Sequence, residues 1–263
     1  NFHLSPALLL KEAKTILEQN DDYGRLTIGQ DQKALVEYAQ MNVAKPMHVG
    51  HLRTTILGDS LKRLYQWSGY ETVSDTHWGD WGTQFGMVLL AYKQEEAEEA
   101  VKADPAGELV RLYISMNKQV EDTPDLREAA KAEFKKLEDG DEENTKLWQW
   151  FVDASIGEFH KVFEIIGILP FEYELGESDY NNKMQSEVDL ALNQDATKQE
   201  GQLVYVDLEE QKLGRCILVK SDGATTYHLR DMATLRERID EFKADKILYV
   251  VDSRQSHHFK QLF

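Results

Sequence analysis

Residues 42–51 read Asn-Val-Ala-Lys-Pro-Met-His-Val-Gly-His and directly follow an apolar run that ends near Ala39. His48 and His51 lie three residues apart, with Gly50 between them, where a strand is predicted to turn into a helix. At such a turn, free backbone N–H groups and the positive helix end favour an anion, and imidazoles can donate hydrogen bonds to phosphate oxygens. The glycine admits close approach of a bulky ligand group. The stretch predicts a nucleotide triphosphate site, although histidines at this spacing are also ordinary neighbours on a helix surface.

The segments around this stretch predict half of a doubly wound α/β domain. A strand candidate at residues 34–39 precedes apolar residues that recur with a helical period from Val49 to Trp67, and a second strand begins at residues 71–74. From about Gln84 to Gly167 the pattern predicts consecutive helices, interrupted at residues 104–107 and 139–141. The other predicted elements are a helix within residues 1–20 capped at Ser5-Pro6, a strand near 171–174, a helix near 183–192, strands at 203–208 and 215–220, a helix at 227–242 and a strand at 246–251.

This order predicts a Rossmann-like, doubly wound parallel sheet that is split by a largely helical connective insertion. We expect a helical lead-in over residues 1–30 and the first half of the nucleotide-binding domain over residues 31–90. The insertion, with its pair of β-strands, is expected over residues 91–220, and the second half of the domain over residues 221–263.

Composition restricts the possible functions. Of the 263 residues, 41% are hydrophobic and 29% are charged, which is typical of a globular protein. A net charge of −17 argues against an autonomous nucleic-acid binder, and the acidic clusters at residues 95–99 and 138–143 predict solvated helix faces. A single cysteine, Cys216, excludes an intrachain disulfide and a cysteine metal site. No apolar run approaches a membrane span and no leader is visible, so we expect a cytoplasmic protein that does not bind a membrane.

Four blocks, at residues 48–59, 79–86, 221–231 and 249–263, occur in family order and resemble the catalytic core of class I arginyl-tRNA synthetases. The resemblance implies ATP-dependent activation of L-arginine and its transfer to the 3′-terminal adenosine of tRNA(Arg). ATP with Mg²⁺ would be a substrate, and no permanent cofactor or metal-ligating residue is expected. Most of the tRNA contact would fall to domains absent from this chain, and we expect a monomer.

Joining a carboxylate to the α-phosphate of ATP needs no protein nucleophile, only positioning and stabilisation of charge on phosphate oxygens. His48 and His51 match the signature histidines to which the family assigns this role. Lys45 lies three residues before His48 and adds a fixed positive charge. Lys45, His48 and His51 are therefore the predicted catalytic residues, and together with Gly50 they form the predicted ATP site.

A guanidinium substrate calls for a carboxylate, ideally in a two-pronged pair. Tyr227 and Asp231 are one helical turn apart and share a face, and they resemble the arginine-recognition pair of the family. The adjacent Arg230 diverges from Asp231 on a helix and need not compete with the substrate. By the same resemblance, Asn42 and Gln255 are expected to bind the α-amino and carboxylate groups of the amino acid. The remaining candidates for arginine binding are Gln40, His51 and Glu177, and residues 79–86 are expected to build a pocket wall.

Two departures from the family pattern leave alternatives open. Gln40-Met41 stands where the family usually has Ser-Pro, and the chain ends before the phosphate-clamping loop and the anticodon-binding domain. We therefore expect a catalytic-domain fragment. The alternatives are a degenerate synthetase paralogue that serves as an arginine-binding or regulatory module, and another nucleotidyltransferase or ligase with the two-histidine signature.

Overall fold

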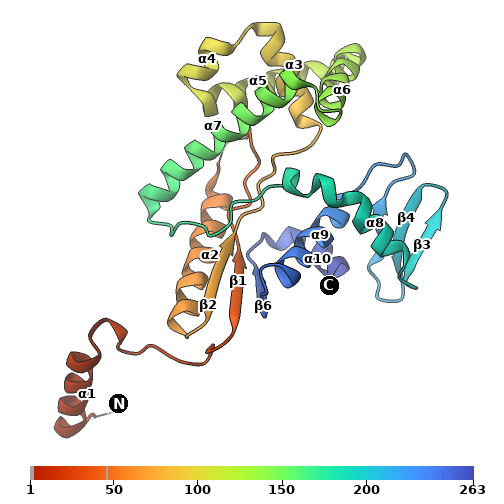
Figure 1. Ribbon diagram of the computed structural model, residues 1–263. Coiled ribbons are helices and arrows are strands. Elements are labelled where there is room, and N and C mark those ends of the chain that lie inside the picture. The colour runs from red at the N-terminus through yellow and green to blue at the C-terminus, as the bar shows by residue number, and fades with distance from the viewer. Residues whose placement is uncertain (1–2, 46) are drawn as a thin grey trace.

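The computed structural model describes residues 3–45 and 47–263, and its centre is a three-stranded parallel sheet (Figure 1). The strand order is β2 (Glu71–Asp75), β1 (Lys33–Glu37) and β6 (Lys246–Tyr249), with Leu35 facing Val73 on one side and Ile247 on the other. Helix α2 (Val49–Trp67) connects β1 to β2. The predicted strand–helix–strand unit is confirmed. The sheet brings together strands from both ends of the chain.

The face of α2 that packs on the sheet is unexpectedly polar. Ile56, Leu57 and Leu64 belong to the apolar period that predicted the helix, yet they are 47%, 48% and 61% exposed. The buried positions on α2 are Thr55, Gly58, Asp59 and Lys62.

These polar groups hold the chain where it returns from the helical insertion. The Lys62 Nζ donates to the Glu172 carboxylate at 2.7 Å and to Ser74 Oγ at 2.9 Å, and Asp59 Oδ1 accepts from the Leu169 N–H at 2.9 Å. Buried charges need such partners, and the returning segment supplies them.

Residues 171–174 do not form the predicted strand. The returning segment makes only isolated bridges, Asp75 to Tyr173 and Trp78 to Gly176. A regular ladder is interrupted because the Ser74 N–H donates to the Glu172 carboxylate at 2.6 Å instead of to a backbone carbonyl. Backbone hydrogen bonds nevertheless join the departing and returning segments, including Thr76 N to Tyr173 O at 3.2 Å and Glu177 N to Trp78 O at 2.9 Å. The insertion therefore leaves and re-enters the sheet domain at one place.

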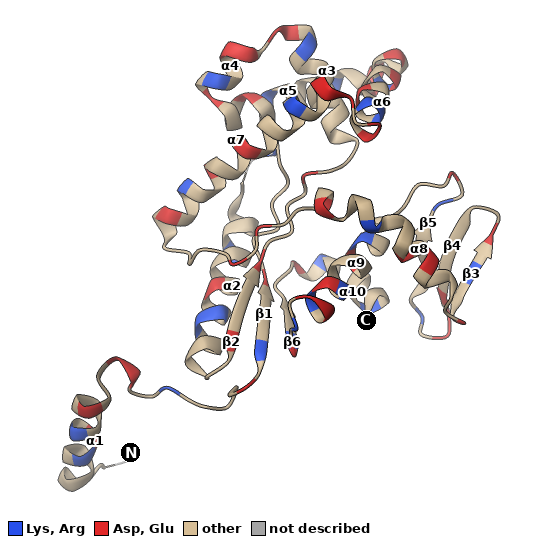
Figure 2. Ribbon diagram, in the orientation of Figure 1, with Lys and Arg blue, Asp and Glu red and all other residues tan. Residues whose placement is uncertain are grey.

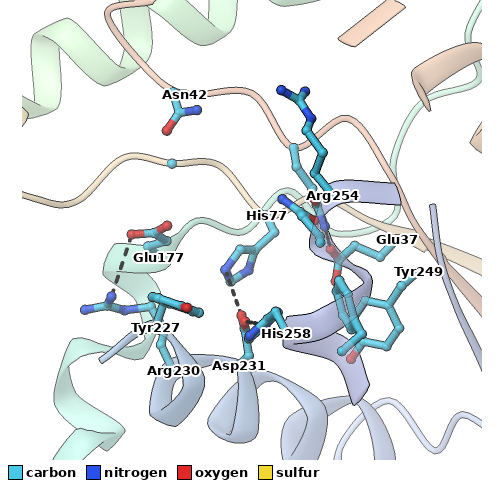
Figure 3. Close-up of a pocket in the computed structure, with 14 residues that line it drawn as sticks. Glu37, Asn42, His77, Glu177, Tyr227, Arg230, Asp231, Tyr249, Arg254 and His258 are labelled. Carbon is cyan, nitrogen blue, oxygen red and sulfur yellow. Dashed lines mark hydrogen bonds and ion pairs between the residues drawn. The ribbon is translucent and has the colours of Figure 1, made fainter. Parts of the chain in front are cut away.

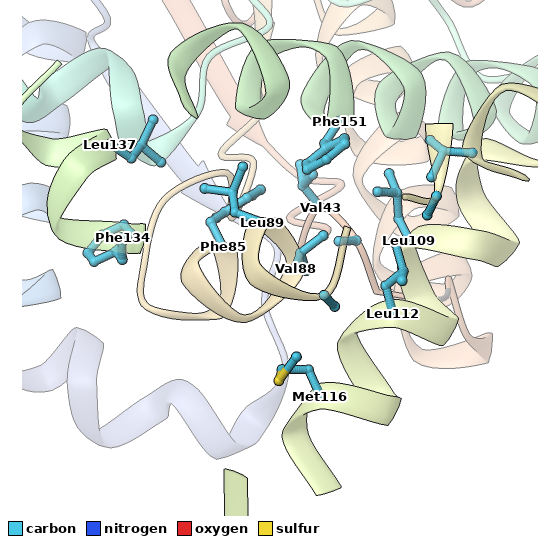
Figure 4. Packing of buried hydrophobic residues seen from close by; sticks show 14 of the residues in the cluster. Val43, Phe85, Val88, Leu89, Leu109, Leu112, Met116, Phe134, Leu137 and Phe151 are labelled. Atoms are coloured by element: carbon cyan, nitrogen blue, oxygen red, sulfur yellow. The ribbon is translucent and has the colours of Figure 1, made fainter. Parts of the chain in front are cut away.

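Five helices form the first part of the insertion: α3 (Gln84–Glu95), α4 (Glu98–Ala103), α5 (Pro105–Asp122), α6 (Pro124–Glu138) and α7 (Glu142–Ile166). The predicted run of helices is confirmed, but the first predicted interruption is confined to Asp104, which caps α5 by accepting from the Gly107 N–H at 3.1 Å. Their apolar faces make one core, which also takes in Val43 from the stretch after β1 (Figure 4). That core fixes the insertion to the segment between β1 and α2.

The acidic clusters of the insertion lie on its surface, as predicted. The acidic residues within 95–99 and 138–143 are exposed, and Figure 2 shows Asp and Glu alternating with Lys and Arg on these helices. Surface ion pairs such as Lys102 with Glu98 and Lys146 with Glu142 join neighbouring turns. Such pairs contribute little to stability.

A second sheet is antiparallel and contains β3 (Thr197–Glu200), β4 (Leu203–Leu208) and β5 (Gly214–Val219). It packs with η2 (Glu177–Lys183), α8 (Met184–Leu192) and α9 (Tyr227–Asp240) around one apolar core. The predicted strand pair and both helices are confirmed. Strand β3 escaped prediction because its residues are polar and mostly exposed.

The ends of the chain carry short helices. Helix α1 (Pro6–Gln19) begins where predicted, with Ser5 Oγ accepting from the Leu8 N–H at 3.2 Å; it is followed by η1 (Asn20–Asp22) and lies apart from the sheet in Figure 1. At the other end, η3 (Ser253–Gln255) leads into α10 (Ser256–Leu262). Within residues 3–45 and 47–263, no helix combines the length and apolar character needed to cross a membrane.

Candidate active site

A cleft of about 400 Å³ opens at the carboxyl end of the parallel sheet (Figure 3). Glu37 and Tyr249 are the last residues of β1 and β6, and His77 follows β2 by two positions. Open α/β sheets bind ligands at this edge. The full lining is Glu37, Gln40, Asn42, His77, Gly79, Glu177, Tyr227, Arg230, Asp231, Tyr249, Arg254, Gln255, His258 and Phe259.

The cleft gathers nearly all the residues that were predicted to hold arginine. They come from the stretch after β1, from η2, from α9 and from η3, and only His51 among them is outside the lining. The members present are Gln40, Asn42, Glu177, Tyr227, Asp231 and Gln255. The residues predicted to bind ATP, which are Lys45, His48, Gly50 and His51, lie outside the lining, around the start of α2.

Asp231 is held between two histidines. His258 Nε2 donates to Asp231 Oδ2 at 2.5 Å, and His77 Nε2 lies 3.5 Å from Asp231 Oδ1. Burial lowers the pKa of His77 to about 4, so its ring is neutral near pH 7. Tyr227 shares the cleft with Asp231, as their spacing predicted, and is 58% exposed. His258 therefore orients the carboxylate through one hydrogen bond, while His77 faces its other oxygen.

Glu177 faces a guanidinium that belongs to the protein. Arg230 Nη1 lies 3.6 Å from Glu177 Oε2, and Arg230 Nη2 donates to Asn181 Oδ1 at 3.2 Å. Burial raises the pKa of Glu177 to about 7, although Arg230 opposes the shift. Arg230 thus does not compete for Asp231, in line with the prediction, but it does pair with Glu177. A substrate that used Glu177 would share it with Arg230.

A buried arginine supports the floor of the cleft. Arg238 is fully buried, pairs with the Glu37 carboxylate, and donates from Nε and Nη2 to Asp75 Oδ2 at 2.9 and 2.7 Å. Burial raises the pKa of Glu37 to about 7 and that of Asp75 to about 6, although Arg238 opposes both shifts. The Gln40 side chain donates to Glu37 as well. Strand ends β1 and β2 are thereby tied to α9.

Of residues 79–86, which were expected to build a pocket wall, Gly79 alone lines the cleft, and the buried Asp80 next to it supports this wall from outside the lining. A Cβ at Gly79 would lie 2.5 Å from Asn42 Oδ1, so only glycine lets the two segments approach this closely. Asp80 is buried and accepts from the Ser178 N–H at 2.9 Å and from its hydroxyl at 2.7 Å. The wall therefore fixes both Asn42 and the segment that carries Glu177.

The two-histidine turn caps helix α2 with its own side chains. His48 Nδ1 accepts from the Gly50 N–H at 3.1 Å, and His51 Nδ1 accepts from the His48 N–H at 3.4 Å. The rings stack with centroids 3.8 Å apart. Because each Nδ1 is an acceptor, each Nε2 carries the hydrogen. Burial, with a smaller effect of His48, lowers the pKa of His51, which favours the neutral ring.

This capping changes the basis of the phosphate prediction. The backbone N–H groups of His48 and Gly50 are occupied by ring nitrogens and are not free for an anion. The two Nε2–H groups remain as side-chain donors. A Cβ at Gly50 would lie 2.9 Å from the His48 ring, so the glycine makes room for that ring. Lys45 Nζ lies 5.6 Å from the centroid of the Tyr113 ring, and Pro46 is outside the described residues.

The sequence reasoning missed several lining residues that a topological rule identifies. His77 and Tyr249 lie where parallel strands end, the position at which α/β sheets hold ligands. His258 and Phe259 lie in the fourth block of the resemblance, but no role was assigned to them because α10 itself was not predicted. In the described parts of the chain, no group of three or more His, Cys, Asp or Glu residues is placed to hold a metal ion.

Comparison with known proteins agrees with the geometry. Residues 12–263 match the family described as tRNA synthetases class I (R), catalytic domain. The chain is 39% identical to an arginine–tRNA ligase of Clostridioides difficile, covering 100% of this chain and 46% of the relative. It is 42% identical to arginine–tRNA ligase 2 of Bacillus anthracis, covering 95% of this chain and 44% of the relative. The chain thus spans less than half the length of these relatives.

Solved structures show the same fold. The arginyl-tRNA synthetase of Plasmodium falciparum superposes with a TM-score of 0.74 at 30% identity, over 93% of this chain and 41% of that one. The Thermus thermophilus arginyl-tRNA synthetase gives a TM-score of 0.66 at 23% identity, over 91% and 40%, and this likeness supports the fold alone. With a family match that covers almost its full length, this chain belongs to the catalytic-domain family of the class I (R) tRNA synthetases.

Proposed function

We propose that the protein containing this chain is an arginine–tRNA ligase and that the chain supplies its arginine-activating site. The reaction joins a carboxylate oxygen of L-arginine to the α-phosphorus of ATP, expels pyrophosphate, and then passes the arginyl group to the 3′-terminal adenosine of tRNA(Arg). The observation that carries the proposal is the convergence of Asp231, Tyr227, Asn42 and Gln255 on one cleft at the carboxyl ends of the parallel strands.

In this proposal the cleft recognises both ends of arginine. Asp231 and Tyr227 take the guanidinium, because a carboxylate with both oxygens oriented matches its planar pair of donors. Asn42, Gln255 and Gln40 offer neutral polar groups to the amino and carboxylate ends. Glu177, already opposite Arg230, is the second carboxylate within reach of the guanidinium.

In this proposal, residues at the start of α2 bind the ATP phosphates. His48 and His51 present neighbouring Nε2–H donors, and Lys45 adds a positive charge nearby. Such N–H donors stabilise the charge that spreads over the phosphate oxygens in the transition state. Mg²⁺ would arrive with the nucleotide as part of the substrate.

We assign the binding of tRNA(Arg) mainly to the part of the longer relatives that this chain does not span. An acidic chain with a net charge of −17 repels a phosphate backbone, so most tRNA contacts belong to parts of the protein outside these residues. We keep the division into residues 1–30, 31–90, 91–220 and 221–263, and the monomeric state, as proposals.

Calorimetric titration of the chain with L-arginine and L-lysine tests the assignment of the cleft. Asp231→Asn should weaken arginine binding by about 2–5 kcal/mol, because it leaves the guanidinium without its charged partner. Asp240→Asn, at the exposed end of the same helix, is the matched control and should bind as the wild type does. L-lysine should bind more weakly than L-arginine because an ammonium cannot make the two-pronged contact.

Equal affinity for the two amino acids, or an unaltered affinity in Asp231→Asn, would contradict the proposal. Arginine-dependent pyrophosphate release by the longer protein then tests the catalytic step. Binding of arginine without any release would favour the alternative of an arginine-binding module.

A further inference from the structure

His258 contacts both members of the predicted guanidinium pair. Its Nε2 donates to Asp231 Oδ2 at 2.5 Å, and its ring meets the Tyr227 ring edge-on with centroids 5.0 Å apart. The two partners lie on α9 and His258 lies on α10, close together in Figure 3. One side chain therefore bridges the aromatic and the acidic half of the pair.

Few other contacts orient these two residues. Within residues 3–45 and 47–263, the Tyr227 hydroxyl makes no hydrogen bond, and its ring otherwise stacks on His228 with centroids 4.3 Å apart. Asp231 has one further neighbour, His77, at 3.5 Å from Oδ1. Without His258, Tyr227 would lose its edge contact and Asp231 its short hydrogen bond.

The protonation of His258 follows from its surroundings. An ionised carboxylate only accepts hydrogen bonds, so Nε2 must carry the hydrogen. Nδ1 is buried and has no hydrogen-bond partner in the described part of the chain. A buried N–H without an acceptor is unfavourable, so Nδ1 is the less suitable place for the hydrogen. His258 thus orients Asp231 through Nε2–H.

The helix that carries His258 is fixed against α9 by a second chain of hydrogen bonds. His228 Nε2 and Gln261 Oε1 are 3.0 Å apart, and Gln261 Nε2 donates to Leu213 O at 2.7 Å. Helix α10 is therefore anchored at two points, and the His258 ring is held where it can direct the carboxylate plane.

We propose that His258 is a positioning residue for amino-acid specificity, which locks Asp231 and Tyr227 in the arrangement that accepts a planar guanidinium and disfavours an ammonium. Asp231 Oδ2 keeps a lone pair for the ligand after it accepts the His258 N–H, and Oδ1 accepts no hydrogen bond from the described residues. The inference rests on the proposed function, because it needs arginine to bind in this cleft.

The first experiment is calorimetric titration of L-arginine and L-lysine into four forms of the chain: wild type, His258→Leu, His258→Gln and His257→Leu. Loss of a hydrogen bond to a charged group should weaken arginine binding about 10- to 100-fold in His258→Leu. Lysine binding should change less, so the preference for arginine falls. The amide of His258→Gln supplies an N–H near the Nε2 position and should restore most of the affinity. His257 is the exposed neighbour on α10, and His257→Leu should behave as wild type.

A double-variant cycle separates positioning from a general loss of structure. If His258 acts through Asp231, His258→Leu should weaken arginine binding far less in an Asp231→Asn background than in the wild type. Equal weakening in both backgrounds, or failure of His258→Gln to recover affinity while the protein remains folded by circular dichroism, would overturn the inference. A wild-type chain that does not bind arginine would instead overturn the proposed function.

A measurement without ligand tests the geometry directly. Long-range proton–nitrogen correlation spectra of the His258 ring should show hydrogen on Nε2. In Asp231→Asn the Nε2 hydrogen bond should weaken and its resonances should shift. An Nε2 without hydrogen would refute the arrangement whatever the arginine titrations show.

Discussion

Replacing Arg238 with methionine should destabilise the protein strongly, and the loss should depend on pH. The guanidinium is fully buried and holds two buried carboxylates, Glu37 and Asp75. Arg238→Met preserves much of the volume and leaves both acids without their cation. Removing one member of a buried ionic group typically costs about 3–5 kcal/mol, so we expect a loss in that range at pH 8.

The pH dependence follows from the carboxyl groups. Burial already raises the pKa of Glu37 to about 7 and that of Asp75 to about 6, above the values of 4.5 and 3.8 expected in the unfolded chain. The folded state therefore binds more protons than the unfolded state, and these groups contribute stability that is lost as pH rises through the folded pKa. Without Arg238 both pKa values rise further, so the deficit of the variant should be small at pH 5 and should grow towards pH 8.

Urea unfolding followed by circular dichroism at pH 5 and pH 8 measures both effects. Arg111→Met is the matched control, since Arg111 pairs with Glu95 and Glu108 while its side chain is 48% exposed. Exposed pairs contribute at most about 1 kcal/mol, so this variant should lose little at either pH. A loss in Arg238→Met no greater than in Arg111→Met, or a deficit that shrinks between pH 5 and pH 8, would refute the reasoning.

Two further perturbations test packing and burial. A Cβ at Gly58 would lie 2.3 Å from the Tyr38 Cβ, whereas a Cβ at Gly157 would meet nothing within 4 Å. Urea unfolding should therefore show that Gly58→Ala destabilises the protein by about 1–3 kcal/mol and that Gly157→Ala stabilises it by about 1 kcal/mol. A shift in the same direction for both variants would contradict this account. Burial raises the pKa of Cys216 to about 11, so a chromogenic disulfide reagent at pH 8 should label it roughly 100-fold more slowly in the folded protein than in urea, while equal rates would show that the thiol is accessible.

Local signals in the sequence predicted most of the elements. The helical period from Val49 to Trp67 delimited α2 correctly, and Ser5-Pro6 marked the beginning of α1. Those signals depend on residues within one or two helical turns of each other, so they can be recognised without knowledge of the tertiary structure. The face of α2 was harder to predict, because its buried positions include Asp59 and Lys62, which each have a partner 110 residues away.

Part of the candidate site was likewise predictable from local sequence. The spacing of Tyr227 and Asp231 predicted that they share one face of a helix, because four residues make about one turn. The bond between Arg238 and Asp75 joins residues 163 positions apart, and nothing in the local pattern marks either residue as a partner. The contact of His258 with Asp231 spans 27 positions and depends on how α10 packs on α9. Pairings of this kind arise from topology, which local periodicity does not encode.

The departing segment Thr76–Trp78 and the returning segment Tyr173–Glu177 form a narrow neck. This neck affects how freely the helices α3 to α7 of the insertion, here called the helical lobe, can change during evolution. Backbone hydrogen bonds join the two segments, so the helical lobe is a long loop whose two ends are held together at the sheet domain. The entropy of closing a loop grows only logarithmically, by roughly 0.6 kcal/mol for each doubling of its length. Lengthening or shortening of α4, α5 or α6 should therefore be well tolerated, provided that the core around Val43 is kept. The cleft residues on either side of the neck would stay in register while the lobe diverged.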